Sequence, residues 1–174
     1  DVRPGVTVVV RKAGDVIPEV VGPVPSLRPA DSVPWTFPRV CPCPLRTELV
    51  RPEGEADTRC VEPACPFQRQ QRIIYFASRG AMDIEGLGER TVEALVERGL
   101  ISDPADLYSL RAEDLTGLEG FGAVSARNLL AGIEGSRTRP LPRLLVALGA
   151  KHLGPAAAES IATAFSTLDA VMAA

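Results

Sequence analysis

A short glycine-containing pattern occurs three times in the second half of the chain and constrains the fold more than any other feature. Each copy reads h-x-G-h-G or a close variant, where h is hydrophobic, and a stretch with helical periodicity follows. The final glycines are Gly88, Gly122 and Gly154, so the repeat period is 34 and then 32 residues. Each copy also places a small or branched apolar residue four positions after this glycine and a larger aliphatic residue seven positions after it. Preservation of both a turn and a helix face predicts one supersecondary unit used three times.

The repeated string is typical of the helix-hairpin-helix motif, in which a tight turn leads into a helix. Glycine suits the turn because it adopts positive φ without steric cost. Its missing side chain lets a phosphate oxygen reach the N–H groups that open the next helix, where the helix dipole favours an anion. The motif therefore predicts contacts to a nucleic-acid backbone, which position a protein without reading bases. The predicted contact residues are Gly86, Gly88, Gly120, Gly122 and Gly154, with Lys151 beside the last hairpin.

A purely structural use of the repeats is the alternative, in which some copies only pack against each other. It applies most to the third copy, where His152 replaces the first glycine. We expect His152, the only histidine, to be a hairpin or surface residue, because no carboxylate or nucleophile spacing around it suggests a proton relay. For Lys151, a solvated side chain is the corresponding alternative.

The composition excludes a strongly basic DNA-binding surface and a membrane span. Nineteen Lys and Arg face 22 Asp and Glu, for a formal net charge of −3. Binding through main-chain amides is compatible with this balance, because those donors do not enter a charge count. No apolar run approaches the roughly 18 residues that a spanning helix needs, so we expect no membrane partner.

Four cysteines lie close together, as two pairs separated by a short polar segment. Two such pairs can bring four thiolates to one tetrahedral ion, and zinc favours soft sulfur ligands. The predicted ligands are therefore Cys41, Cys43, Cys60 and Cys65. So small a segment has little core of its own, and metal binding would supply much of its folding energy. Two disulfides or inert buried thiols are the alternatives.

Proline separates the chain into two kinds of structure. Twelve of the 16 prolines lie in residues 1–66. There, the β-branched run 6–10 and the apolar run 16–21 flank an Ala-Gly-Asp turn and predict two paired strands. Two strands cannot bury a core alone, so they are expected to be the last strands of a β-barrel or sheet whose other strands precede Asp1. Residues 22–40 read as an extended connector.

From Gln68 onward the apolar residues recur at helical spacing. The segments lie around residues 73–77, 92–96, 129–133, 144–148 and 161–165. The predicted fold is therefore mainly α, a helix-hairpin-helix domain preceded by a small four-cysteine zinc finger and the terminal strands of an incomplete β-barrel, which the family resemblance described below implies to be of OB type. The expected divisions are 1–38 for strands and connector, 39–68 for the finger and 69–174 for the helical domain.

The chain resembles the C-terminal half of bacterial NAD-dependent DNA ligases, in three pieces that follow the family's order. V-x-V-R-K-A-G-D-V-I-P-E-V-V (8–21) looks like the end of the family's oligonucleotide-binding barrel. R-P-E-G-E-A-D-T-R-C (51–60) looks like part of its zinc finger. A-S-R-G-A-M-D-I-E-G-L-G (77–88) through A-L-G-A-K-H-L-G (147–154) looks like its helix-hairpin-helix domain. The family usually spaces its first cysteines as C-x₂-C followed by glycine, whereas Cys41-Pro-Cys43-Pro is one residue tighter.

This resemblance implies a role in joining a 5′-phosphate to a 3′-hydroxyl at a DNA nick during replication and repair. Family members use NAD to adenylate a lysine in a K-x-D-G motif and need magnesium, but no K-x-D-G string occurs here. The chain alone is therefore expected to grip DNA without binding NAD or sealing a nick. Arg11 and Lys12 would face the duplex, and the zinc finger would orient the helical domain. A fourth hairpin and a BRCT domain would be expected beyond the last residue.

The resemblance further implies a monomer that binds nicked double-stranded DNA in the bacterial cytoplasm, associated with the nucleoid. A stand-alone zinc and helix-hairpin-helix module without enzymatic activity, such as a repair scaffold, is the runner-up. The partial barrel argues against it, because an independent module would not begin in the middle of a sheet. A protein-interaction domain that uses the hairpins only for packing would show no salt-dependent DNA affinity.

Overall fold

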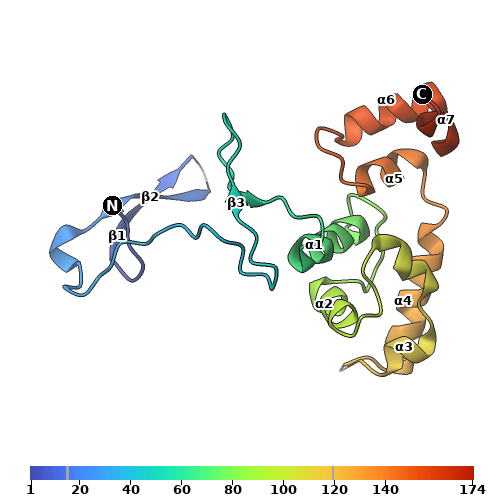
Figure 1. Ribbon diagram of the computed structural model, residues 1–174, viewed down its shortest axis with the longest axis horizontal. Helices are drawn as coiled ribbons and strands as arrows, with labels where there is room; N and C mark the ends of the chain where they lie inside the picture. Colours follow the sequence, from blue (N-terminus) through green and yellow to red (C-terminus); the bar gives the residue numbers. More distant parts are fainter. Residues whose placement is uncertain (15, 119) are drawn as a thin grey trace. The chain divides into compact units, whose positions relative to one another are not determined.

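The computed structural model describes residues 1–14, 16–118 and 120–174 (Figure 1). Its contacts divide the chain into two compact units, Asp1–Cys41 and Pro42–Ala174. No helix in the described ranges is long and apolar enough to cross a membrane.

The first unit is built on one antiparallel hairpin. Strand β1 (Val8–Ala13) pairs with β2 (Ile17–Pro23), with a register irregularity between Val9 and Val10. The predicted pair of strands is confirmed, although Asp15 of the predicted turn lies outside the described residues. The predicted connector contains one short 3-10 helix, η1 (Pro25–Leu27). Most apolar strand residues, namely Val9, Val10, Ile17, Val20 and Val21, are at least half exposed, so this hairpin has no core of its own.

The second unit begins with a small hairpin and continues as helices. Strand β3 (Leu49–Val50) pairs with β4 (Arg59–Cys60). The helical elements are α1 (Pro66–Ala77), α2 (Glu89–Glu97), η2 (Pro104–Ser109), α3 (Ala112–Thr116), α4 (Ala123–Ser136), α5 (Leu141–Ala147), α6 (Pro155–Phe165) and α7 (Leu168–Met172). All five segments predicted from helical spacing are helices, whereas η2, α3 and α7 were not predicted because each is only five or six residues long.

The periodicity that predicted the helices also places their buried faces. In α2 and α4 the apolar residues four and seven positions after the N-cap glycine are almost fully buried, namely Val92, Leu95, Ala126 and Leu129. They join residues of α1, η2 and α3 in the main core. Burial of one face stabilises short helices that would be marginal alone in water.

A second, smaller core lies between α5, α6 and α7 at the C-terminal end of the unit (Figure 1). Leu145, Val146 and Ala158 are its buried members. Helix α5 belongs to both cores, because Ala147 packs into the main one. The third repeat is therefore joined to the first two through α5.

Close packing of α4 against the first repeat predicts opposite effects for two glycines in that helix. A methyl group at Gly132 would lie 3.2 Å from the carbonyl oxygen of Glu85, whereas one at Gly135 would meet nothing described within 4 Å. Alanine favours a helix over glycine by up to about 1 kcal/mol. We expect Gly135→Ala to keep or raise the free energy of unfolding and Gly132→Ala to lower it relative to Gly135→Ala by about 1 kcal/mol. Urea unfolding of both variants measures this, and equal stabilities would contradict the close approach.

Candidate metal centre and nucleic-acid interface

Three of the four cysteines form a buried thiol cluster. The Sγ atoms of Cys41, Cys43 and Cys65 all lie within 4.8 Å of one another. The three residues are at most 4% exposed. Four sulfurs bound tetrahedrally at ~2.3 Å from zinc lie about 3.8 Å apart, so a small contraction would bring these atoms to zinc-binding distances. The residues present fit a structural zinc ion.

The local backbone explains why Cys65 suits this role. Cys65 is the N-cap of α1, Pro66 occupies the first helical position, and the Cys65 carbonyl accepts from the N–H of Arg69 at 3.0 Å. A thiolate at a helix N-terminus is stabilised by the helix dipole. Cys43 lies in a turn, where its carbonyl accepts from the N–H of Arg46 at 3.0 Å.

Cys60 is half-buried on β4, opposite Leu49, and does not belong to the described group of three. Its carbonyl accepts a 3.4 Å hydrogen bond from Gln68 Nε2, which ties the strand to the first turn of α1. No disulfide joins the four cysteines, all of which the structure describes. The structure thus brings together three of the four predicted ligands, and Cys60 stays a predicted fourth ligand.

The three repeats share two backbone features among the described residues. We call residues 84–88, 118–122 and 150–154 hairpins 1, 2 and 3. The third position of each has positive φ: +84° at Gly86, +78° at Gly120 and +69° at His152. In hairpin 3 a histidine therefore adopts the conformation that favours glycine. The exposed His152 lies in the turn, as the sequence predicted.

The last glycine of each hairpin is the N-cap of the following helix. Gly88, Gly122 and Gly154 have extended backbone, with φ of −80°, −92° and −84°. Each cap carbonyl accepts from the N–H four residues later at 3.0 Å. The third repeat thus has the same positive φ in its turn and the same N-cap conformation as the first two.

These cap glycines are required neither by backbone strain nor by packing among the described residues. Their φ values are open to any residue, and an added Cβ at Gly88, Gly122 or Gly154 would meet nothing described within 4 Å. Ser, Asp or Asn would cap a helix better, because their side chains accept from its first N–H groups. Glycine instead leaves the first-turn donors available to an acceptor from outside. Helix α6 offers one fewer, because Pro155 has no N–H.

Polar side chains accompany the first two hairpins. A hollow of about 640 Å³ is lined by both turns together with Thr91, Ser125 and Asn128. Thr91 and Ser125 stand at the same place in their repeats, three residues after the cap glycine, where the third repeat has Ala157. This recurrence of a hydroxyl is a sequence signal for a shared polar surface that the glycine pattern alone does not reveal.

The predicted basic contacts already have partners or face solvent. Arg11 Nε lies 2.7 Å from Oε2 of Glu19, its cross-strand neighbour, and Lys12 is exposed. Lys151 Nζ lies 2.7 Å from Oε1 of Glu55, a carboxylate that also pairs with Arg59 in the segment between the cysteine pairs. The ion pair of Lys151 links hairpin 3 to the finger, and a phosphate would have to compete with Glu55.

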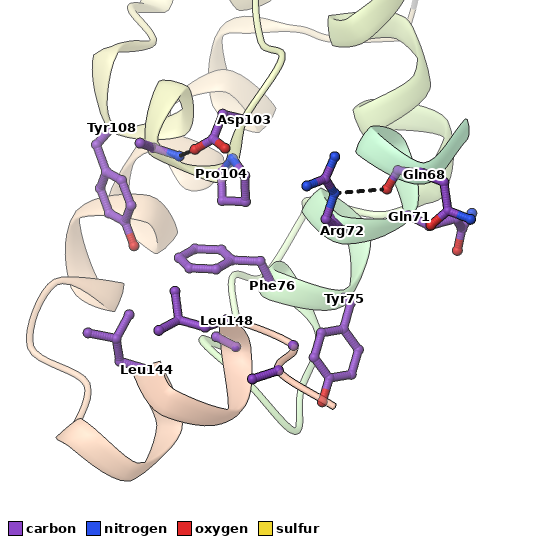
Figure 2. A pocket seen from close by; sticks show the side chains of 14 residues that line it. Gln68, Gln71, Arg72, Tyr75, Phe76, Asp103, Pro104, Tyr108, Leu144 and Leu148 are labelled. Atoms are coloured by element: carbon purple, nitrogen blue, oxygen red, sulfur yellow. Dashed lines mark hydrogen bonds between the residues drawn. The ribbon is translucent and has the colours of Figure 1, made fainter. Parts of the chain in front are cut away.

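A second hollow, of about 630 Å³, lies between α1, η2 and the end of α5 (Figure 2). Its walls are mainly Tyr75, Phe76, Tyr108, Leu144 and Leu148. Leu148, inside the predicted helical segment 144–148, is 59% exposed and follows the end of α5.

The acidic groups near this hollow serve as helix caps. Asp103 accepts from the N–H of Ala105, and Asp106 accepts from the N–H groups of Ser102 and Asp103. These backbone hydrogen bonds hold the pKa of Asp106 below its usual value. Among the described lining residues we find no paired nucleophile and base, and the hollow does not resemble a catalytic site.

A thiol cluster beside tandem hairpins defines a class of protein, a helix-hairpin-helix protein with a structural zinc finger. Residues 79–134 match the SAM-like helix-hairpin-helix tandem, and residues 46–66 match the NAD-dependent DNA ligase C4 zinc finger domain. The chain thus matches the zinc-finger and helix-hairpin-helix region of NAD-dependent DNA ligases.

Similarity to DNA ligases extends over nearly the whole chain. It is 52% identical to a DNA ligase of Symbiobacterium thermophilum over 173 residues, which are 98% of this chain and 26% of the relative. It is 51% identical to DNA ligase 2 of Deinococcus deserti, covering 99% of this chain and 25% of the relative. A DNA ligase of Rubrobacter xylanophilus is 55% identical over 93% of this chain and 24% of its own length. The chain thus spans about a quarter of the length of the curated relatives it matches.

We predict that zinc binding by the thiol cluster and folding of the helical cores are independent of each other. We expect Cys43→Ser to lower the zinc content of the purified chain from about one ion to well below one, because the cluster loses a buried ligand. Helical circular dichroism should change little, since no cysteine belongs to either described helical core. Metal analysis and dichroism on the same sample measure both effects. Collapse of the helical signal would show that the cores need the metal.

Proposed function

We propose that this chain grips the sugar-phosphate backbone of nicked duplex DNA as the DNA-binding part of an NAD-dependent ligase. The observation that carries the proposal is the glycine N-cap found in all three repeats, because neither its φ nor packing among the described residues requires glycine there. Three sets of helix-opening donors are left for an acceptor, and a phosphate oxygen is the acceptor that such helix N-termini favour.

The remaining predicted residues have supporting roles in this proposal. A zinc ion bound by Cys41, Cys43, Cys65 and Cys60 would fix the finger. Residues Arg11 and Lys12 would contact the duplex, while Lys151 would exchange Glu55 for a phosphate. The hydroxyls of Thr91 and Ser125 would add contacts beside the first two hairpins.

The chemistry of ligation belongs to other parts of the parent protein in this proposal. The chain has no K-x-D-G string for adenylation by NAD, and its contribution is to hold the nick while the parent, with magnesium, joins the 5′-phosphate to the 3′-hydroxyl. We also propose that the chain acts as a monomer, in the bacterial cytoplasm and at the nucleoid.

The direct test is fluorescence anisotropy of labelled nicked, intact and single-stranded DNA with the purified 174-residue chain at several salt concentrations. We expect the tightest binding to the nicked duplex, with a linear fall of log K against log salt. The slope should be about −0.9 for each phosphate contact. Absence of salt-dependent binding in a folded, zinc-loaded sample would refute the proposal and favour packing as the purpose of the hairpins.

A single substitution should weaken this binding without unfolding the chain. We expect Gly122→Glu to reduce affinity for nicked duplex at least about tenfold, because a carboxylate would stand at the phosphate position, a change of roughly 1.4 kcal/mol. Gly135→Glu is the matched control, since it adds the same charge to α4 in equally open space near the other end of the helix. Equal affinities of the two folded variants would remove hairpin 2 from the interface.

A further inference from the structure

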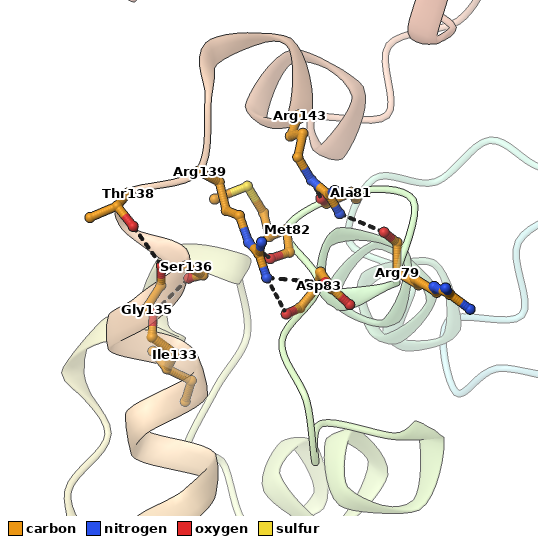
Figure 3. Close-up of polar contacts among 10 residues, drawn as sticks. All are labelled: Arg79, Ala81, Met82, Asp83, Ile133, Gly135, Ser136, Thr138, Arg139 and Arg143. Carbon is orange, nitrogen blue, oxygen red and sulfur yellow. Dashed lines mark hydrogen bonds and ion pairs between the residues drawn. The ribbon is translucent and has the colours of Figure 1, made fainter.

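The loop before hairpin 1 is bound by Arg139, which lies in the connection between α4 and α5 (Figure 3). Arg139 Nε donates to the carbonyl of Met82 at 3.1 Å. Its Nη2 donates to the carbonyl of Asp83 at 3.2 Å and to Oδ2 of the same residue at 3.0 Å. One guanidinium therefore holds two consecutive residues that directly precede hairpin 1.

A second arginine, in the first turn of α5, binds the same loop. Arg143 Nε donates to the carbonyl of Ala81 at 2.6 Å, and its Nη2 donates to the carbonyl of Arg79 at 2.5 Å. We call Arg139 and Arg143 the arginine clamp. Both side chains direct their donors to backbone carbonyls about 60 residues earlier in the chain, in a fork geometry that the single ammonium of lysine cannot reproduce.

Asp83 shows what the clamp holds in place. Its φ is +53°, a left-handed conformation that is costly for residues with a side chain, although Asp tolerates it better than most. Such a conformation persists only where the surroundings over-determine it. Arg139 bonds both the carbonyl and the carboxylate of Asp83, and the N–H of Asp83 donates to Ser78 at 2.9 Å.

The placement of hairpin 1 follows from this loop. Ile84, its first residue, is buried and its N–H donates to Ala77 at 2.9 Å, so the path from α1 to hairpin 1 is short and fixed. From the other side, α4 approaches Glu85 at Gly132. Arg143 connects the loop to α5, and α5 leads directly into hairpin 3. The arginine clamp thus joins the entrance of hairpin 1 to the helix that enters hairpin 3.

We propose that Arg139 and Arg143 are positioning residues. They hold hairpins 1 and 3 at a fixed position relative to each other, so that both hairpins can contact the same DNA backbone, and neither arginine contacts DNA itself. This inference rests on the proposed function of the hairpins. Arginines in a DNA-binding region are expected to contact phosphates. The proposal instead gives these two arginines a role inside the protein.

The test compares Arg139→Gln and Arg143→Gln with Arg137→Gln in the full chain. Arg137 is the matched control because it lies two residues before Arg139, at the C-cap of α4, and its variant loses the same charge. Its guanidinium contacts Glu134 and the Tyr108 ring instead of the loop. Arg139→Lys and Arg143→Lys keep the charge while losing the fork, and they replace the Gln variants if those do not fold. Circular dichroism confirms folding at the temperature of each measurement.

We expect both clamp variants to bind nicked duplex about 5- to 30-fold more weakly, the factor expected for one or two lost positioning hydrogen bonds. The slope of log K against log salt should equal that of the unmodified chain, and Arg137→Gln should keep its affinity. A slope smaller by about 0.9 in a clamp variant would reveal a direct phosphate contact and overturn the proposal. Unchanged affinity in the folded variants would overturn it as well, because a purely structural role lowers only stability.

Amide hydrogen exchange in the absence of DNA separates this proposal from the proposed function. Loss of the clamp should accelerate exchange at residues 81–87 and leave hairpin 2 unchanged. Protection in hairpin 1 that survives loss of the clamp would refute the positioning role. If the unmodified chain does not bind DNA, the proposed function fails, while the exchange result still decides whether the clamp positions hairpin 1.

Discussion

The turn that ends in an extended glycine and opens a helix is the constraint on which the helical unit depends. It fixes the direction of α2, α4 and α6, and it places the buried residues four and seven positions later against a core. The same turn leaves the first N–H groups of each helix without an internal acceptor. One local geometry therefore serves both packing and the proposed backbone contact. This explains how a chain with a net charge of −3 can be suited to DNA.

The three hairpins do not lie in one continuous core. Hairpins 1 and 2 pack with α1 and α4, whereas hairpin 3 belongs to the smaller cluster of α5, α6 and α7. Helix α5 connects hairpin 3 to the rest of the unit, and two polar contacts strengthen this connection. The arginine clamp binds the loop before hairpin 1, and Lys151 binds Glu55 of the finger segment. Judged by charge alone, these basic side chains would be expected to contact DNA. They instead connect parts of the protein, and a hydrogen bond from a charged donor is stronger than one between neutral groups.

The sequence predicted the hairpins well because their determinants are local. Glycine spacing, helical periodicity and the β-branched runs each act within a few residues, and the corresponding turns, helices and strand pair are confirmed. Three of the four predicted metal ligands come together, and the exception is Cys60, which lies on β4. Helices η2, α3 and α7 were missed, because five or six residues are too few to show a period. The hydroxyls of Thr91 and Ser125 were also missed, although their repeat position is visible in the sequence.

The sequence by itself determined the repeat unit, the zinc-binding composition and the resemblance to NAD-dependent ligases, because these properties belong to residue types and short spacings. Only the tertiary structure showed that His152 adopts the positive φ that glycine has in the first two hairpins. It also decided that Arg139 and Arg143 bind carbonyls of residues 79–83 rather than face solvent. No local rule relates positions some 60 residues apart, and their contact arises when packing of α1, α4 and α5 brings the donors to the acceptors.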